Sequence, residues 1–294
     1  MASTRDFKQR IRSVKNTQQI TRAMKLVAAS KVRRCQERIE NARPYSDKIS
    51  ELVNSLSLHV DQDAHPLLKT DTDDQKALLI VISSDRGLCG GYNTNLLREG
   101  MQFLQEREAE NKETLITVVG NKGREFLSRR NYTFKNEFPD VYGRIDFSLA
   151  ETLSDLLVQS FLDNEVGEVY LLTTEFKSVI SQQPTITRLL PLSPPVPDGI
   201  NEEGEPVVSD YIFEPSLEEV LIDILPKHIN AQVYRALLDA EASEFGSRMI
   251  AMDNASRNAE EMIGTLTLQM NRVRQASITT ELLEVVSGAD ALAG

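Results

Sequence analysis

The sequence predicts an α/β protein that combines a long antiparallel coiled coil of N- and C-terminal helices with a small Rossmann-like α/β domain. Three observations carry this prediction. Residues 1–43 contain neither glycine nor proline and carry a single apolar stripe. Strand and helix patterns alternate over residues 77–176. A second long helical pattern fills residues 216–287, so the two ends of the chain supply the two long helices.

The N-terminal helix is expected over residues 1–60. Its apolar side chains recur every three and four residues, which places them along one side of a helix. The stripe continues to Val60 beyond Pro44, where the missing amide donor predicts a kink or a short local break. Up to residue 43 the stripe consists of Phe7, Ile11, Val14, Thr21, Met24, Ala28, Val32, Cys35, Ile39 and Ala42.

A solvated linker at residues 61–76 is expected to lead into an α/β domain at residues 77–195. The continuous apolar run ALLIVISS at 77–84 predicts a strand buried on both faces, as in a parallel sheet. Alternating patterns favour a mostly parallel sheet with crossover helices. They predict further strands at 114–120, 132–138 and 168–176, and helices near 93–110, 121–130 and 146–163.

Prolines mark the end of this domain. Seven of the eleven prolines lie in residues 184–215, which predicts an extended, poorly ordered crossing segment, acidic and proline-rich over 196–215. The C-terminal helix is expected over 216–288, kinked at Pro226 and stopped at Gly288. Its narrow apolar stripe fits an antiparallel coiled coil with the first helix, because the domain between them can return the chain to its start.

Charge is divided unevenly along the chain. The protein has a net charge of −11, yet residues 1–43 carry twelve Lys or Arg against three Asp or Glu, which leaves −20 for the remainder. Such a segment fits nucleic acid, an anionic membrane or an acidic protein surface. Phe7 is its only aromatic residue, which disfavours base stacking, and its Ala, Val, Thr and Met side chains suit helix packing more than lipid. The favoured interpretation is therefore that this segment binds an acidic protein partner. The alternative is that the chain is a coiled-coil nucleic-acid-binding protein.

The glycine-rich stretch SSDRGLCGGYN at 83–93 invites comparison with phosphate-binding loops. It lacks the lysine of GxxxxGK[ST] and the spacing of GxGxxG, so a tight strand-to-helix turn is the favoured interpretation over a nucleotide-using enzyme. Cys89 has no histidine or acid spaced to activate it. His59, His65 and His228 are isolated and are expected on the solvated surface. The sequence therefore predicts no catalytic residue, no metal site and no cofactor.

The last helix carries a second group of polar residues. Arg274 and Gln275 are adjacent, and Thr279 and Glu281 follow within two turns, before the weakly apolar end LLEVVSGADALAG. Two interpretations stay open from the residues alone, a capped terminal helix or a tip inserted into a partner's socket. No stretch of the sequence is long and apolar enough to span a bilayer, so a soluble or peripheral protein is expected.

Three motifs in order resemble one family over the whole chain. SVKNTQQITRAMKLVAASK, SSDRGLCGGYN and ITTELLEVVSGADA are similar to the N-terminal helix, the internal signature and the C-terminal signature of the gamma subunits of F-type ATP synthases. The resemblance implies a non-catalytic central-stalk rotor. Its two helices would form a shaft inside a hexamer of alpha and beta subunits, and its α/β domain a foot beside an epsilon subunit on a ring of c subunits.

The resemblance also implies a mechanism and a location. Ion flow through the c ring would turn the shaft, which drives the beta subunits through their nucleotide states, or ATP hydrolysis would pump ions in reverse. Membrane contact would occur only through the complex, with no nucleic acid involved. The absence of a cysteine pair in the crossing segment and the unprocessed-looking start favour a bacterial chain, peripheral on the cytoplasmic face of the inner membrane.

Family roles carry over to matching positions only. Met24 and Lys25, in RAMK, match the part of the shaft that faces an acidic lever loop of the beta subunit. Arg274 and Gln275, in RQASIT, match contacts with a beta-subunit catch loop, and Thr279 and Glu281 belong to the same signature. The basic excess of residues 1–43 is then partly a match for the acidic lever.

Overall fold

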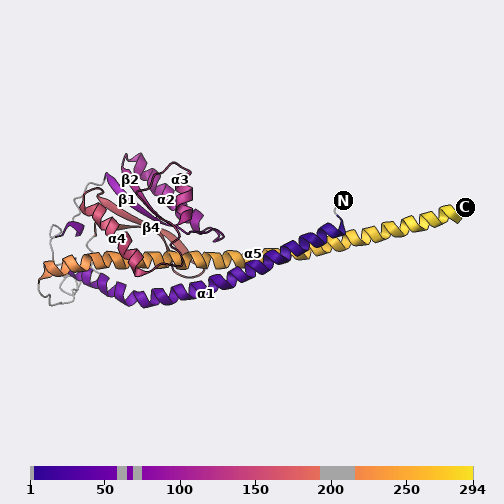
Figure 1. Cartoon of the computed structure of the whole chain (residues 1–294), viewed down its shortest axis with the longest axis horizontal. Coiled ribbons are helices and arrows are strands. Elements are labelled where there is room, and N and C mark those ends of the chain that lie inside the picture. Colours follow the sequence, from indigo (N-terminus) through magenta and orange to yellow (C-terminus); the bar gives the residue numbers. More distant parts are fainter. Residues whose placement is uncertain (1–2, 58–64, 69–74, 193–215, 294) are drawn as a thin grey trace, which may run out of the picture. The chain divides into compact units, whose positions relative to one another are not determined.

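The computed structural model describes residues 3–57, 65–68, 75–192 and 216–293. The chain divides into two compact units, a helix unit (Met1–Ala29 and Arg248–Gly294) and an α/β unit (Ser30–Ser247). Figure 1 follows the chain from its N-terminus to its C-terminus through both. The expected crossing segment at 196–215 and most of the expected linker at 61–76 lie outside the described residues.

Two long helices occupy the ends of the chain. Helix α1 spans Thr4–Ser57 and helix α5 spans Leu217–Ala293, each unbroken through its internal proline, Pro44 or Pro226. A proline removes one amide donor, and the bonds of the turns on either side keep the helix continuous. Gly288 does not stop α5, contrary to the sequence expectation, because a lone glycine lowers helix stability by only about 1 kcal/mol.

A five-stranded mixed sheet forms the centre of the α/β unit, with the strand order β3-β2-β1-β4-β5. The pairs β1–β2, β1–β4 and β2–β3 are parallel, and β4–β5 is antiparallel. The strands are β1 (Lys76–Ile82), β2 (Glu113–Val119), β3 (Asn136–Phe138), β4 (Glu168–Phe176) and β5 (Gln182–Leu190). The connecting helices are α2 (Tyr92–Ala109), α3 (Asn121–Ser128) and α4 (Phe147–Leu162).

Strand β1 separates two hydrophobic cores. Because successive side chains of a strand point to opposite faces, Leu78 and Ile80 enter one core while Leu79 and Val81 enter the other. The first core also takes side chains from α4, α5 and the second half of α1, and the second takes them from α2 and α3. Within the α/β unit, Figure 1 shows α2 and α3 together on one side of the sheet.

Strand β5 was not expected, because its region was interpreted as part of the crossing segment. Pro184 lies within the strand and pairs with Thr174 of β4. Since β5 is the last of the described strands in the order, no described strand pairs with its second side, and an edge strand tolerates a residue without an amide donor. The strand adds one antiparallel pair to three parallel ones, so the sheet is mixed and mostly parallel, as the sequence predicts.

Two further expectations about solvated positions were wrong. Leu67 and Leu68 lie in a short 3-10 helix, η2 (Pro66–Leu68), and are buried in the first core, so this part of the expected linker is not solvated. His228 is also buried on α5, where its Nε2 lies 2.6 Å from Gln232 Nε2. Burial lowers the pKa of His228 to about 4, so the ring is neutral near pH 7.

Candidate functional site

In the helix unit, α1 and α5 pack along stripes that repeat every seven residues. Phe7, Thr21 and Ala28 are buried on α1, as the sequence pattern predicts, and Met252, Ser256 and Ala259 are buried on α5. This spacing is typical of coiled-coil contacts. Met262, one of the apolar residues of the C-terminal helix, is instead 53% exposed.

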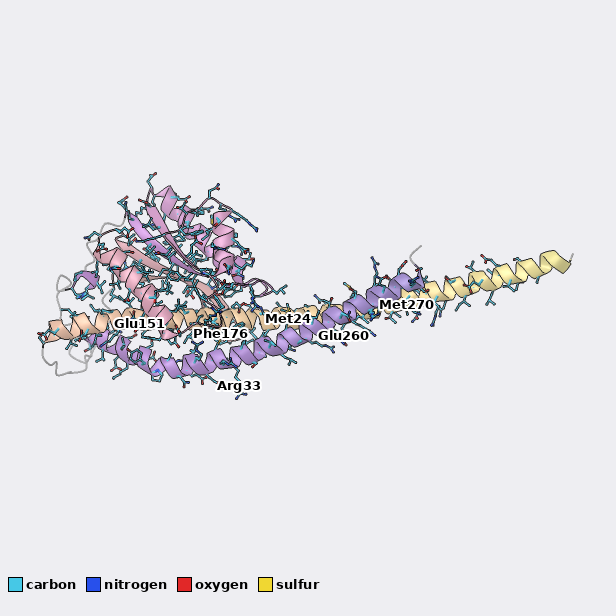
Figure 2. The ribbon with its side chains drawn as sticks, in the orientation of Figure 1. Met24, Arg33, Glu151, Phe176, Glu260 and Met270 are labelled. Atoms are coloured by element: carbon cyan, nitrogen blue, oxygen red, sulfur yellow. The ribbon has the colours of Figure 1, made fainter. Side chains whose placement is uncertain are left out.

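Polar pairs cross between the two helices at successive turns. Lys25 Nζ lies 2.5 Å from Asp253 Oδ1, Thr21 Oγ1 lies 2.7 Å from Ser256 Oγ, and Arg22 Nη2 lies 3.2 Å from Glu260 Oε2. The α1 residues with lower numbers than Lys25 pair with α5 residues that have higher numbers than Asp253. The two helices are therefore antiparallel. Figure 2 labels Met24 and Glu260 in this region and Met270 further along α5.

Met24 and Lys25 lie at the edge of this contact. Met24 is half-buried, and the Lys25 side chain is 41% exposed while its ammonium is bonded to Asp253. The hydrogen bond from Lys25 lowers the pKa of the Asp253 carboxyl, so this carboxylate is ionised near neutral pH. Both side chains therefore offer atoms to solvent, and neither is fully committed to the helix pair.

Arg274, Gln275, Thr279 and Glu281 lie in a different setting. From Arg274 to Ala289 every side chain of α5 is exposed. The Thr279 hydroxyl donates to the Gln275 carbonyl at 3.0 Å, a bond within the helix. At 1.5 Å per residue, Arg274 lies roughly 30 Å along α5 from Asp253, so the structure does not bring the two groups of predicted site residues together.

Sequence reasoning missed the acidic and hydroxyl residues of α5 that face α1. Asp253, Ser256 and Glu260 recur every three and four residues, which is a helical signal for one face. Their partners on α1 lie more than 200 residues away in the sequence, and the register that joins them depends on tertiary packing. The sequence therefore shows that these residues share one face of α5, but not which part of the protein that face contacts.

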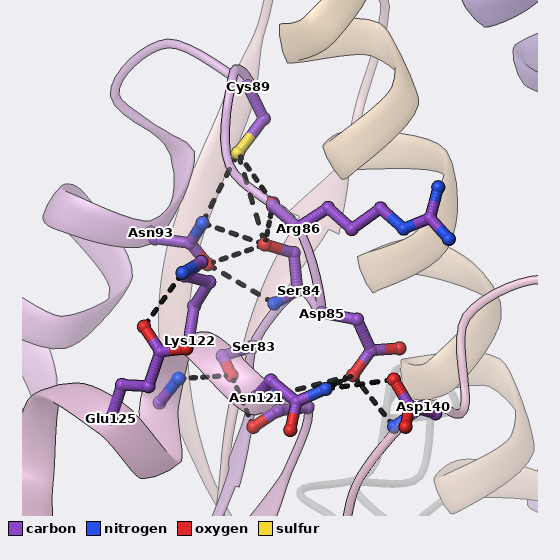
Figure 3. A network of polar contacts seen from close by, with 12 residues as sticks. Ser83, Ser84, Asp85, Arg86, Cys89, Asn93, Asn121, Lys122, Glu125 and Asp140 are labelled. Atoms are coloured by element: carbon purple, nitrogen blue, oxygen red, sulfur yellow. Dashed lines mark hydrogen bonds and ion pairs between the residues drawn. The ribbon is translucent and has the colours of Figure 1, made fainter.

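The turn at residues 83–93 is filled by its own polar side chains (Figure 3). The carboxylate of Asp85 accepts the backbone N–H groups of Asn121, Asp140 and Tyr142 at 3.1, 3.0 and 2.9 Å. Asn121 begins α3, so the amide that a phosphate would approach is already bonded to a carboxylate. The arrangement fixes loops and supports the structural interpretation of this motif.

Close packing at the same edge depends on one glycine and a buried serine. Gly120 has φ +91°, and a Cβ atom there would lie 2.0 Å from the Ser83 carbonyl oxygen. The Ser83 hydroxyl accepts the N–H of Gly123 at 2.7 Å. Cys89 is 2% exposed, and its sulfur accepts from Asn93 Nδ2 at 3.2 Å, so this thiol is a packed side chain of the turn.

Comparison with known proteins identifies the family. A family model described as ATP synthase matches residues 3–292. The chain is 49% identical to the ATP synthase gamma chains of Geotalea daltonii and of Geobacter metallireducens, in each case over the whole of both chains. The chain belongs to the ATP synthase gamma chain family. Gamma chains are non-catalytic subunits of an enzyme complex, and this agrees with the structural character of the glycine-rich turn.

Solved structures share this gamma-chain fold. The chain is similar to one from the central stalk and c ring of the Tetrahymena thermophila mitochondrial ATP synthase, with 30% identity and a TM-score of 0.63 over 81% of this chain and 99% of that one. A chain from the Euglena gracilis mitochondrial ATP synthase, with 21% identity, gives a TM-score of 0.67 over 98% and 94% and shows the fold alone. Over the residues that the structure describes, no helix has the length and apolar character needed to cross a membrane.

Proposed function

We propose that this gamma chain is the central-stalk rotor of a bacterial ATP synthase, coupling ion flow through a c ring to the nucleotide states of the catalytic beta subunits. The same rotor would run in reverse when ATP hydrolysis pumps ions. The observation that carries the proposal is the 49% identity to gamma chains over the entire length, with all three family motifs in place.

The contacts in the helix unit suit a rotating part. Arg22 and Glu260 are 59% and 70% exposed, and Lys25 and Asp253 are 41% and 23% exposed. Exposed ion pairs contribute about 0–1 kcal/mol, so partner groups can exchange with them at small cost. We propose that Met24 and Lys25 meet the acidic lever of a beta subunit here, where Lys25 can share its ammonium between Asp253 and the lever.

We propose a second contact on the exposed part of α5. Arg274, Gln275, Thr279 and Glu281 would bind the catch loop of one beta subunit. The more terminal side chains Val285 and Val286 are 70% and 57% exposed, and an apolar environment inside the hexamer would cover them. These features support a polar catch followed by a weakly apolar bearing, separated along one helix.

Partners and division of labour follow from the same proposal. Residues 1–60 and 216–288 would form the shaft, and residues 77–195 the foot, joined by the linker at 61–76 and the crossing segment at 196–215. The chain would contact alpha and beta subunits along the shaft, and an epsilon subunit and the c ring at the foot. It would be peripheral on the cytoplasmic face of a bacterial inner membrane, held there by the complex.

The test is purification of the tagged chain from its native membrane, followed by mass identification of partners and a single-molecule rotation assay. Alpha, beta, epsilon and c subunits should copurify, and a probe on the chain should rotate when ATP is added. Isolation of the chain with nucleic acid and without alpha or beta subunits would instead support the alternative of a nucleic-acid-binding coiled coil.

A further inference from the structure

A partly buried ion pair links the two long helices within the α/β unit. Arg38 Nη1 on α1 lies 3.1 Å from Glu241 Oε2 on α5, and the Glu241 side chain is only 3% exposed. Arg38 keeps 30% of its side chain exposed, but taking the Glu241 charge out of water is costly, and an apolar pair of similar size is often as stable. The free energy of folding alone therefore does not explain why a charged pair occupies this position.

The two side chains of the pair also bind one loop, residues 139–146, which joins β3 to α4. Glu241 Oε1 accepts the N–H of Gly143 at 3.0 Å, and Arg38 Nη2 donates to the carbonyl oxygen of Ile145. Arg38 Nη2 also lies 3.4 Å from the hydroxyl of Tyr234 on α5. Both long helices are thus bonded to the same three-residue stretch of backbone.

The other side of this loop is bonded to the sheet. Asp85, three residues beyond the end of β1, accepts the N–H groups of Asp140 and Tyr142 at 3.0 and 2.9 Å. The Tyr142 hydroxyl lies 3.2 Å from that of Tyr92, at the start of α2, and Ile145 is buried in the first core. The loop therefore bridges the carboxyl edge of the sheet to the two helices at closely spaced backbone positions.

Directional bonds do what apolar contacts cannot. Apolar packing attracts without fixing direction, whereas charge-assisted hydrogen bonds restrict the relative orientation of the groups that they join. Neutral bonds also tie α5 to β4, from Thr173 to the Ala236 carbonyl and from Ser243 to the Thr174 carbonyl, both at 3.2 Å. Those bonds involve α5 only, whereas Arg38 brings α1 into the same connection.

We infer that Arg38 and Glu241 are positioning residues that form, with the loop at 139–146, the joint through which torque passes between the paired helices and the sheet. The inference rests on the proposed rotor function. Without these two residues, torque would pass between the helices and the sheet only through α5 and the apolar side chains around it. With the joint intact, α1, α5 and the sheet edge turn as one body.

The experiment measures the torsional stiffness of the assembled ATP synthase. A cysteine at exposed Ser128, at the end of α3, would carry a biotin-linked probe, because Cys35 and Cys89 are buried at 3% and 2% exposure and react slowly. With the catalytic hexamer immobilised and stalled, the spread of probe angles reports how stiffly the α/β unit follows the helices.

The variants are Arg38→Gln and Glu241→Gln, which keep side-chain size. Arg33→Gln is the matched control, since Arg33 pairs at 3.1 Å with Glu37 on α1 itself.

Each joint variant should raise the angular variance about twofold, because one of the two charged side chains that bind the loop becomes neutral. ATP hydrolysis without load should stay near the parent rate. Arg38→Lys should give an intermediate variance, since lysine keeps the charge without the fork. A purely structural role would lower the yield of complex and leave the variance of assembled complexes unchanged. Parent-like variance in the assembled variants, Glu241→Gln included, overturns the joint. Absence of ATP-driven rotation in the parent complex would overturn the rotor function instead.

Discussion

The hydroxyl of Thr21 on α1 lies 2.7 Å from the hydroxyl of Ser256 on α5, and both side chains are buried in the contact between the helices. A polar pair inside an otherwise apolar seam is satisfied only in one register, because sliding either helix by a turn separates the two hydroxyls. Nearby exposed ion pairs are too weak to define the register by themselves.

We expect Thr21→Val to lower the free energy of unfolding by about 1 kcal/mol, because valine keeps the shape of threonine and removes one buried hydrogen bond. Ser256→Ala should cost a similar amount, and the double variant less than the two losses combined. Urea unfolding of the full chain, followed by circular dichroism, gives these values. Full additivity would show that the two hydroxyls do not interact. Thr17→Val, at an exposed position on α1, is the control.

Met24→Lys should reduce ion pumping per ATP hydrolysed while assembly persists. The added ammonium would lie at a half-buried position beside Lys25, and a charged hydrogen bond to the acidic lever, worth about 1.5–3 kcal/mol, would deepen one rotary position. Proton uptake and phosphate release measured together on membrane vesicles give the ratio. Met24→Leu, which adds no charge, should keep the parent ratio. An unchanged ratio in the lysine variant would contradict the assignment of Met24.

Asp239 and His228 should give opposite dependences of stability on pH. Desolvation, opposed by Arg235, raises the pKa of Asp239 from 3.8 to about 6, so below pH 6 the folded state binds a proton that the unfolded chain does not. This stabilises the fold as pH falls. Burial lowers the pKa of His228 from 6.5 to about 4, so below pH 6.5 the unfolded chain binds the extra proton and the fold loses stability. Each effect is about 3 kcal/mol at most.

Asp239→Asn should therefore be more stable than the parent at pH 7, since a buried charge is removed, and should lose stability more steeply between pH 6.5 and 4. Urea unfolding at a series of pH values measures both trends. Asp155→Asn, at an exposed position on α4, serves as the control and should follow the parent curve. Parallel curves for Asp239→Asn and the parent would show that Asp239 has an ordinary pKa.

The tip of α5 should divide into two functional parts. Removing residues 285–294 should leave substantial rotation, while Arg274→Ala with Gln275→Ala should slow turnover far more than it weakens assembly, since a charged hydrogen bond is worth roughly 1.5–3 kcal/mol. A single-molecule rotation assay on the truncated chain and on the double variant tests this division. Arg272→Ala, at a neighbouring exposed position, should turn like the parent. A truncated chain that cannot rotate, beside a double variant that rotates normally, would refute the division.

The sequence predicted the elements whose signals are local. The repeat of apolar residues identified the two long helices, and the uninterrupted run at 77–84 identified β1, because burial on both faces leaves no alternation. Strand β5 escaped prediction since Pro184 suggested a loop, and only its place at the sheet edge makes the proline acceptable.

Side-chain surroundings were harder to predict than elements. His228 was expected in solvent because it stands alone in the sequence, yet its side chain is buried on α5. The joint formed by Arg38 and Glu241 joins residues 203 positions apart with a loop between them, and no local pattern marks either residue as a partner. Met24, Lys25, Arg274 and Gln275 were selected by family resemblance, and their roles await the experiments above.

The make-up of the helix unit has a consequence for biosynthesis. The whole α/β unit, residues 30–247, is synthesised between the two halves of the helix unit, residues 1–29 and 248–294. At about 5–20 residues per second, the N-terminal half waits at least ten seconds for its partner. Most helical stability in proteins comes from the packing of an apolar face, so during this interval the newly made segment lacks the contacts with α5 that stabilise it. The α/β unit already contains the second half of α1 and the start of α5, so only residues 4–29 of α1 must wait for residues 248 and beyond before they can pack against α5.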